Sequence, residues 1–295
     1  MAFQKAQRQG QKAKIMLMGP SNGGKTLSAL ILAAKLAQLE GQSLEGSVAV
    51  IDTEQGRSSY YLGSKHLPKG FWWDTEPVDP PHDALRYVRL IEAARKEYKV
   101  LIWDSMTPVW NAAGGLRDLH DKIVGRGKGN EFTAWGEVGK HQKRLIDALM
   151  LTDIHIICTV RSKMGYEFIK EEGKKGEVKK LGFAPEWRAG LEYEFPVAIS
   201  LDGADHTAIF SKDNTGLFED QTPELVQPKH AEILWTWLQQ AQPAPEYSPQ
   251  PVTPVEHREE AAPSRVTHHP ATTKKAAPKA PPKDRANEPE YDPFD

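Results

Sequence analysis

A glycine-rich segment near the start of the chain carries the residues best suited to chemistry. Residues 19–26 read G-P-S-N-G-G-K-T, which fits the phosphate-binding pattern G-x-x-x-x-G-K-[ST] at every position. Glycines let backbone N–H groups turn toward phosphate oxygens, and the start of a following helix adds the positive end of its dipole. The residues expected to bind a nucleoside triphosphate are Gly19, Pro20, Ser21, Asn22, Gly23, Gly24, Lys25, Thr26 and Leu27. Lys25 is suited to the β- and γ-phosphates, and the Thr26 hydroxyl to Mg²⁺.

Two later apolar runs end in carboxylates. Residues 99–105 read K-V-L-I-W-D-S, so Asp104 is expected at the end of a buried strand, where it can hold Mg²⁺ beside the phosphate loop. Residues 47–54 read S-V-A-V-I-D-T-E and place Asp52 and Glu54 at the tip of another strand. Either acid could polarise a water for in-line attack on the γ-phosphate. Spacing alone leaves the choice between Glu54 and Asp52 open, with the other capping the turn.

The elements that must position these residues alternate between strand and helix. Such alternation predicts an α/β fold with a mostly parallel sheet covered by helices on both faces. Strands are expected at 14–18, 47–51, 99–103 and 154–160, with a hairpin of 194–201 and 206–211 at one end of the sheet. Helices are expected at 27–40, after a cap at Asp79-Pro80, at 132–150 with Trp135, Val138, Leu145 and Leu149 facing inward, and at 232–239.

The composition changes sharply near residue 241. From Ala241 onward the chain has no Leu, Ile, Met, Trp or Cys and holds twelve of the 22 prolines. A segment of this kind cannot bury a core, so we expect a disordered tail with an acidic tip. The predicted organisation is a basic N-terminal segment at 1–13, one folded nucleotide-binding domain at 14–240 and the tail at 241–295.

Charge and composition exclude several classes of protein. The net charge of −2 argues neither for nor against a polyanionic partner, because binding depends on where charge is concentrated. The N-terminal segment lacks the apolar run of a signal peptide, and no stretch approaches the length of a membrane span. We therefore expect a cytoplasmic protein without membrane contacts. The single cysteine, Cys158, excludes an internal disulfide and is expected to be a small buried residue.

The order of these motifs along the chain resembles the RecA-type ATPase core. The motifs are the phosphate loop, the strand that ends at Asp52-Thr53-Glu54, the strand that ends at Asp104-Ser105 and the strand 154–160. The resemblance covers residues 12–240 and is closest to the compact, core-only RecA-like ATPases of phages, some of which act in single-strand annealing or recombination. It implies ATP and Mg²⁺ as cofactors and catalytic roles for Lys25 and Glu54, with Thr26 and Asp104 at the metal. It thereby favours Glu54 over Asp52 as the residue that activates water.

The resemblance also implies a DNA-binding role for two basic loops. In RecA-like proteins the loops after the corresponding strands line a channel for single-stranded DNA, and residues 121–130 and 161–180 match them by position. Cations can follow a phosphate backbone while aromatic side chains stack on bases, although charged loops are most often only solvated surface. The candidate DNA contacts are Lys122, Arg126, Lys128, Arg161, Lys163, Lys174, Lys175, Lys179 and Lys180.

Together these features predict a magnesium-dependent ATPase that binds single-stranded DNA and promotes annealing or recombination, of phage origin. The expected partners are single-stranded DNA, further copies of the chain in a ring or filament, and a single-strand-binding protein. Two alternatives remain. One is a P-loop phosphotransferase for a small molecule, which would need an arginine-rich lid. The other is a DNA-annealing module that uses nucleotide only as a structural ligand.

Overall fold

The structure, a computed structural model, describes the greater part of the chain. The described residues are 10–127, 130–169, 177–188 and 190–240, with only the backbone at 164–169 and 177–183. Contacts divide the chain into two units, residues 1–244 and 245–295, and every described residue lies in the first. Residues 1–9 and the tail from 241 lie outside the described residues. The expected boundaries at 13/14 and 240/241 therefore stay predictions.

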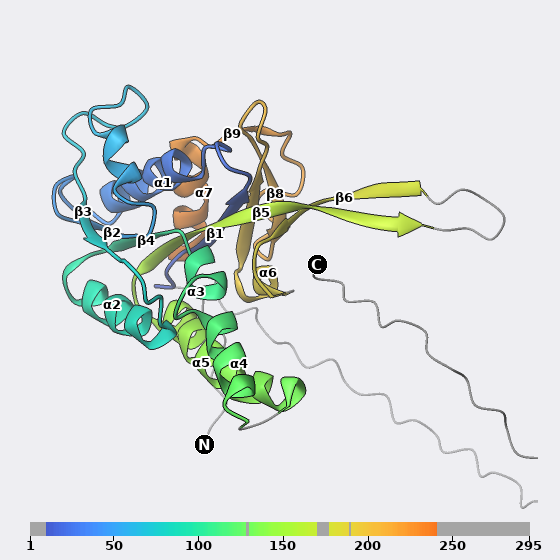
Figure 1. The fold of residues 1–295 in the computed structure, drawn as a ribbon. Coiled ribbons are helices and arrows are strands. Elements are labelled where there is room, and N and C mark those ends of the chain that lie inside the picture. The colour runs from blue at the N-terminus through green and yellow to red at the C-terminus, as the bar shows by residue number, and fades with distance from the viewer. Residues whose placement is uncertain (1–9, 128–129, 170–176, 189, 241–295) are drawn as a thin grey trace, which may run out of the picture. The chain divides into compact units, whose positions relative to one another are not determined.

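A mostly parallel sheet forms the centre of the described chain (Figure 1). Its order is β3-β2-β4-β5-β1-β7-β8-β9, with β6 paired to β5 outside this path. The first six of these strands run parallel, and β6, β8 and β9 pair antiparallel. The bounds are β1 Lys14–Gly19, β2 Val48–Asp52, β3 Asp74–Pro77, β4 Val100–Asp104, β5 His155–Ile169, β6 Glu177–Pro185, β7 Val197–Leu201, β8 Thr207–Asp213 and β9 Glu224–Leu225.

Helices cover both faces of the sheet. On one face α1 packs against α7, and on the other α2 packs against α5, which also contacts α4. The bounds are α1 Lys25–Leu39, η1 Arg57–Tyr61 (a 3₁₀ helix), α2 Ala84–Glu97, α3 Thr107–Asn111, α4 Leu116–Gly125, α5 Glu131–Leu151, α6 Leu191–Glu194 and α7 Pro228–Gln239. Among the residues described, no helix combines the length and apolar character that a membrane crossing requires.

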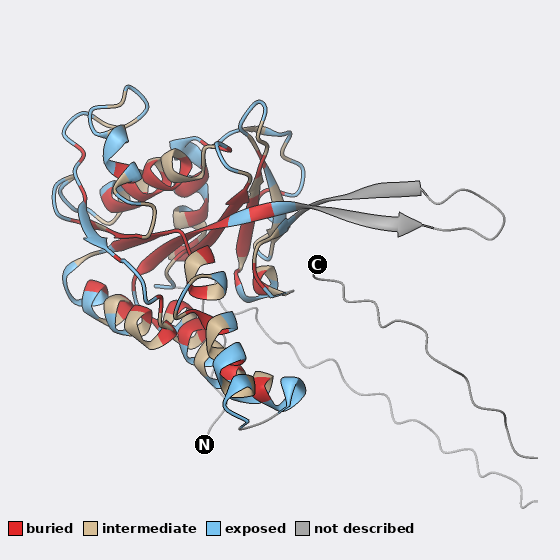
Figure 2. Ribbon diagram, viewed as in Figure 1, coloured by how far each residue is buried: buried red, intermediate tan, exposed pale blue. Residues whose placement is uncertain are grey.

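The sequence of the central strands explains this layering. Successive side chains of a strand point to opposite faces, and in β1 Ile15 and Leu17 join the core under α1 while Met16 and Met18 join the core under α2. The side chains of β4 alternate between the same two cores. Strands that are apolar along most of their length are typical of a parallel sheet buried on both faces, and in Figure 2 the central strands carry the buried colour while the edge strand β3 is exposed.

The predicted α/β fold class, a mostly parallel sheet with helices on both faces, is confirmed. The expected strands appear as β1, β2, β4 and β5, and the expected hairpin as β7 and β8. Helix α5 buries Val138, Leu145 and Leu149 as expected, while Trp135 is half-buried against the same core. Cys158 is a buried free thiol in β5.

Three local expectations were wrong. Asp79-Pro80 does not begin α2, because the side chain of Asp83 caps that helix by accepting the Arg86 N–H at 3.0 Å. The segment 121–130 is not a loop throughout, since α4 continues to Gly125. The segment 161–180 is largely strand rather than loop, because β5 runs to Ile169 and β6 begins at Glu177.

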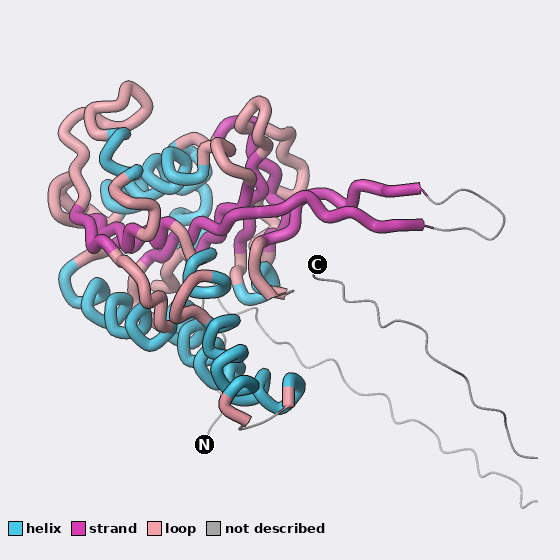
Figure 3. The backbone as a smooth tube through the Cα atoms, viewed as in Figure 1, coloured by secondary structure: helices cyan, strands magenta, loops and turns pink. Residues whose placement is uncertain are grey.

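Strand β5 has two parts with different surroundings. Its first residues lie in the sheet between β1 and β4, and its later residues pair only with β6, from Ser162 opposite Pro185 to Ile169 opposite Glu177. We call this two-stranded extension, residues 162–169 and 177–185, the arm (Figure 3). One strand therefore runs from the middle of the sheet into the arm without a break.

Candidate nucleotide-binding site

A cavity of about 710 Å³ opens at the carboxyl edge of the sheet. Its volume lies within the range of small-ligand sites. The strand register explains its position, because it sets Asp52 opposite Asp104 and Arg161 opposite Gly19. The residues that line it are Ser21, Asn22, Gly23, Gly24, Lys25, Thr26, Leu27, Ser28, Ile31, Glu54, Arg57, Tyr60, Tyr61, His66, Asp104, Arg161, His206, Leu225 and Val226.

The phosphate loop connects β1 to α1 in a conformation that its glycines permit. Gly24 has φ of 82° at the N-cap of α1, a left-handed conformation that L residues with side chains rarely adopt. A Cβ on Gly19 would lie 2.9 Å from the carbonyl oxygen of Leu201, so the neighbouring strand requires glycine there. The loop thus delivers the free N–H groups at the start of a 15-residue helix into the cavity.

Lys25 lies over this loop. Its Nζ donates to the carbonyl oxygens of Gly19 at 3.0 Å and Pro20 at 2.7 Å. Burial lowers the pKa of Lys25, and the carboxylates of Asp104 and Glu54 oppose that shift. The side chain thus lies in the cavity on two neutral carbonyl acceptors, which a more negative partner such as a phosphate can replace.

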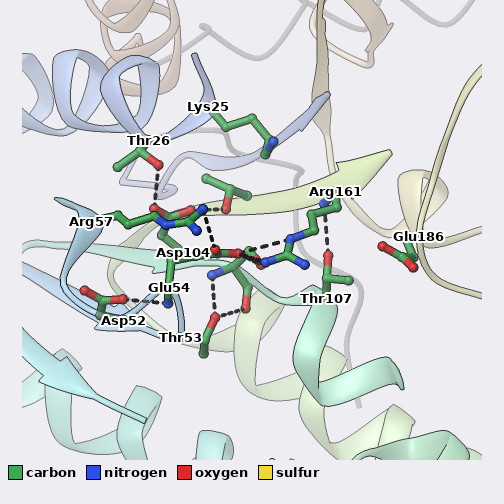
Figure 4. Close-up of polar contacts among 12 residues, drawn as sticks. Lys25, Thr26, Asp52, Thr53, Glu54, Arg57, Asp104, Thr107, Arg161 and Glu186 are labelled. Atoms are coloured by element: carbon green, nitrogen blue, oxygen red, sulfur yellow. Dashed lines mark hydrogen bonds and ion pairs between the residues drawn. The ribbon is translucent and has the colours of Figure 1, made fainter. Parts of the chain in front are cut away.

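Asp104 and Thr26 meet although they lie on different elements. The Thr26 hydroxyl donates to Oδ2 of Asp104 at 2.7 Å, and the Thr159 hydroxyl donates to Oδ1 (Figure 4). Burial raises the pKa of Asp104, and the two hydroxyl donors oppose the shift. A hydroxyl beside a carboxylate fits Mg²⁺, which binds through few protein oxygens and keeps several waters. In keeping with so small a ligand set, no group of three or more His, Cys, Asp or Glu in the described part of the chain could hold a metal.

The turn after β2 separates the roles of Asp52 and Glu54. Asp52 is buried, and its carboxylate accepts the N–H of Glu54 at 2.7 Å and of Gly56 at 2.9 Å. Thr53 joins the turn to β4, because its hydroxyl accepts the Ser105 N–H at 2.8 Å and donates to the Ser105 carbonyl oxygen at 3.0 Å. Asp52 is thus occupied in shaping the turn, and Glu54 is the acid that faces the cavity.

Two arginines hold the Glu54 carboxylate. Arg161 contacts Oε1 through Nε at 3.2 Å and a terminal nitrogen at 2.7 Å, and Arg57 contacts Oε2 at 3.3 Å (Figure 4). The Ser105 hydroxyl also donates to Oε1 at 3.2 Å. The structure therefore places Arg161, a candidate DNA contact, over the acid in the cavity.

The other candidate DNA contacts in the described residues lie on or next to α4 and on the two strands of the arm. Lys122 lies on α4 and pairs with Asp118 at 2.7 Å, and Arg126 is exposed just after that helix. Lys163 lies at the foot of the arm and pairs with Glu186 at 2.8 Å. Lys179 and Lys180 lie on β6. Lys128, Lys174 and Lys175 are outside the described residues.

Sequence reasoning missed three residues of the site: Arg57, Ser105 as a donor to Glu54, and Thr159. A polar Thr159 inside the apolar strand 154–160 was a detectable signal, because a buried hydroxyl needs a hydrogen-bond partner. Arg57 gave a weaker signal, three residues after Glu54. Nothing local in the sequence connects Ser105 with Glu54.

Comparisons with known proteins give a family match and similar solved structures. A family profile described as an AAA domain matches residues 11–216. No curated protein matches the sequence. Among solved structures, the chain is similar to a KaiC-like protein from the hyperthermophilic archaeon Pyrococcus horikoshii OT3, with 18% sequence identity over 70% of this chain and 81% of that chain and a TM-score of 0.37.

Proposed function

The chain belongs to the AAA domain family of P-loop ATPases, and from this premise we propose that it is a magnesium-dependent ATPase that binds single-stranded DNA and promotes annealing or homologous recombination. The resemblance to core-only RecA-like ATPases further favours a phage origin and action in the host cytoplasm. One observation carries the ATPase part of the proposal. The Thr26 hydroxyl, the Asp104 carboxylate and the Glu54 carboxylate meet in one cavity beside the phosphate loop.

The residues of the cavity divide the work of hydrolysis between them. Lys25 would exchange its two carbonyl contacts for the β- and γ-phosphates, while the loop N–H groups bind the remaining oxygens. Thr26 and Asp104 would hold Mg²⁺, which neutralises charge that develops on the phosphates. Glu54 would accept a hydrogen bond from the attacking water and orient it in line with the bond that breaks.

The arm supports the proposal of DNA binding. It is rooted in the same strand that carries Arg161 at the cavity, and its sequence includes Lys163, Lys179 and Lys180. Lys174 and Lys175 belong to the stretch that joins the two strands of the arm. Contacts between lysine side chains and the DNA phosphates would give affinity without sequence preference, as a protein that anneals arbitrary strands requires.

Assembly is the third part of the proposal. We expect the chain to form a ring or filament on DNA, as its RecA resemblance implies, and to cooperate with a single-strand-binding protein. Large side chains that are strongly exposed in the described residues are available for such contacts, among them Tyr60, Phe132 and Tyr193.

Phosphate release from ATP, measured with and without single-stranded DNA, tests the proposal. Mg²⁺-dependent release that DNA stimulates would support it, and strand annealing should then be measured on the same sample. Lys25→Ala should lose most ATP binding and all measurable hydrolysis, because Lys25 is the cation of the phosphate loop. Unchanged turnover in this variant would overturn the site assignment.

Two other results would replace the proposed function. ATP turnover that DNA does not stimulate, with transfer of the phosphate to an added small molecule, would identify a phosphotransferase. ATP binding without turnover in the parent protein, together with annealing that is lost in Lys25→Ala, would identify a module that uses nucleotide only as a structural ligand.

A further inference from the structure

The Glu54 carboxylate is held by two arginines on opposite oxygens. Arg161 contacts Oε1 and Arg57 contacts Oε2, and the Glu54 side chain retains only 11% of its exposure. A carboxylate oxygen that is to take a proton from water must be able to turn a lone pair toward that water. The geometry therefore raises the question of which arginine gives way when a nucleotide enters the cavity.

The backbone of Arg161 is anchored on both sides, and its side chain makes two contacts with Glu54. Its N–H donates to the Thr107 hydroxyl at 2.9 Å, and its carbonyl oxygen accepts the Glu186 N–H at 2.6 Å. Its strand register to Gly19 fixes the backbone between these two contacts. The guanidinium reaches Oε1 through two nitrogens, at 3.2 and 2.7 Å, although its side chain is 49% exposed. Arg161 is thus built to keep its place.

Arg57 is held much more loosely. It is the first residue of the five-residue η1, its side chain is 64% exposed, and its contact with Oε2 is a single one at 3.3 Å. Exposed ion pairs with one long contact contribute little to stability. Both Arg57 and the phosphate loop line the cavity, so a triphosphate there would offer Arg57 a partner with more negative charge than one carboxylate.

We propose that Arg57 is a phosphate-binding catalytic residue that leaves Oε2 of Glu54 for the γ-phosphate when ATP binds, a proposal that rests on the ATPase function above. Arg161 remains on Oε1 as a positioning residue. The water oxygen then bonds to the γ-phosphorus while the bridging P–O bond breaks and its electron pair leaves with ADP. The water proton passes to the freed Oε2 and from there to the released phosphate.

Nucleotide affinity in a Glu54→Gln background isolates the phosphate contact, because turnover and the Arg57–Glu54 ion pair are both removed. Adding Arg57→Ala should weaken ATP binding about tenfold, the loss of one charge-assisted contact, and change ADP binding less than about twofold. Arg95→Ala is the matched control, since Arg95 also pairs with a glutamate three residues before it, on α2 far from the lining residues. It should change neither affinity.

Steady-state kinetics separates the two arginines. Arg57→Ala should mainly raise KM for ATP and Arg57→Lys should recover part of the loss, whereas Arg161→Ala should mainly lower kcat. Equal losses of ATP and ADP affinity, or no loss, would overturn the role of Arg57 and leave it a simple partner of Glu54. Failure of the proposed ATPase function reads differently, because the protein with Glu54 and Arg57 intact would then release no phosphate from ATP in the presence of Mg²⁺.

Discussion

At the scale of single residues, two acids only two positions apart have different surroundings. Asp52 is 3% exposed and accepts two backbone N–H groups, so its carboxylate is part of the turn. Glu54 receives side-chain donors from Arg57, Arg161 and Ser105 and lines the cavity. The difference follows from strand alternation broken by the turn, which sends one carboxylate back onto the chain and the other outward.

Substitutions at these two acids should therefore fail in different ways. Glu54→Gln should bind ATP normally and lose hydrolysis by at least about a hundredfold, because the amide cannot take a proton from water. Asp52→Asn should lower the free energy of unfolding by about 1–3 kcal/mol, because its NH₂ would face a backbone N–H that now lacks an acceptor. Urea unfolding and single-turnover hydrolysis measure the two effects. Wild-type turnover in Glu54→Gln would contradict the assignment.

At the scale of elements, β5 does two jobs. Its sheet segment supplies Thr159 to Asp104 and Arg161 to Glu54, and its arm segment carries Lys163 and pairs with β6, which carries Lys179 and Lys180. The Glu186 N–H bonded to the Arg161 carbonyl oxygen ties the returning strand of the arm to the same point. DNA bound to the arm would therefore act next to Arg161, the residue that positions Glu54.

Neutralising the arm should weaken DNA binding in a salt-dependent way. Changing Lys174, Lys175, Lys179 and Lys180 to Gln should lower affinity for single-stranded DNA and flatten its dependence on salt by about 0.7 in the log–log slope for each phosphate that is no longer neutralised. Fluorescence anisotropy over a salt series measures this slope. Lys140→Gln with Lys143→Gln on α5 is the control, since these lysines pair with acids on their own helix. Identical slopes in arm variant and parent would reduce the arm to solvated surface.

At the scale of the whole described domain, a polar network joins the segment before β1 and the helix α7 to the centre of the sheet. His155 is fully buried in β5, where Nδ1 accepts the Ala13 N–H at 2.9 Å and Nε2 lies 2.9 Å from Glu40 at the end of α1. Glu40 also accepts from Lys12 at 3.0 Å and from the indole of Trp235 on α7 at 3.1 Å. The neutral imidazole of His155 and the Glu40 carboxylate thus connect β5 with the segment before β1 and with α1 and α7.

This network should make the protein sensitive to mild acid. Burial lowers the pKa of His155 below 6.5, aided by Lys12 and Lys14 and opposed by Glu40, and the His155 hydrogen bond lowers the pKa of Glu40 below 4.5. The folded state then binds fewer protons than the unfolded state, so the stabilisation is complete above about pH 6.5 and is lost as the pH falls. The Glu40 part is lost only below about pH 4.5.

Urea unfolding between pH 7.5 and 5 tests this prediction. In His155→Gln the amide oxygen can still accept the Ala13 N–H, but the side chain no longer titrates. The slope of unfolding free energy against pH should fall by up to about 1.4 kcal/mol per unit, the value for one proton. Buried His82 and His230, whose pKa values are also lowered by burial, should keep part of the slope. An unchanged slope would show that His155 does not carry the effect.

Much of the site follows from the sequence because its signals are local. The phosphate loop is eight consecutive residues, and Asp104 and Glu54 each follow an apolar run that can only be a buried strand. The alternation of strands and helices fixed the α/β class by the same kind of evidence. Local signals also misled, since Asp79-Pro80 fits the start of a helix but the side chain of Asp83 caps α2 instead.

Only the tertiary structure decided which distant side chains share the cavity. Arg161 meets Glu54 across 107 positions, and Thr159 meets Asp104 across 55, because β5 is inserted between β1 and β4. The arm could not be predicted from the sequence either. Its two strands pair with each other beyond the sheet, so no packing against the hydrophobic core requires a periodic apolar pattern in their sequence. Strand order depends on the burial of the entire sheet at once, and no local run of residues encodes it.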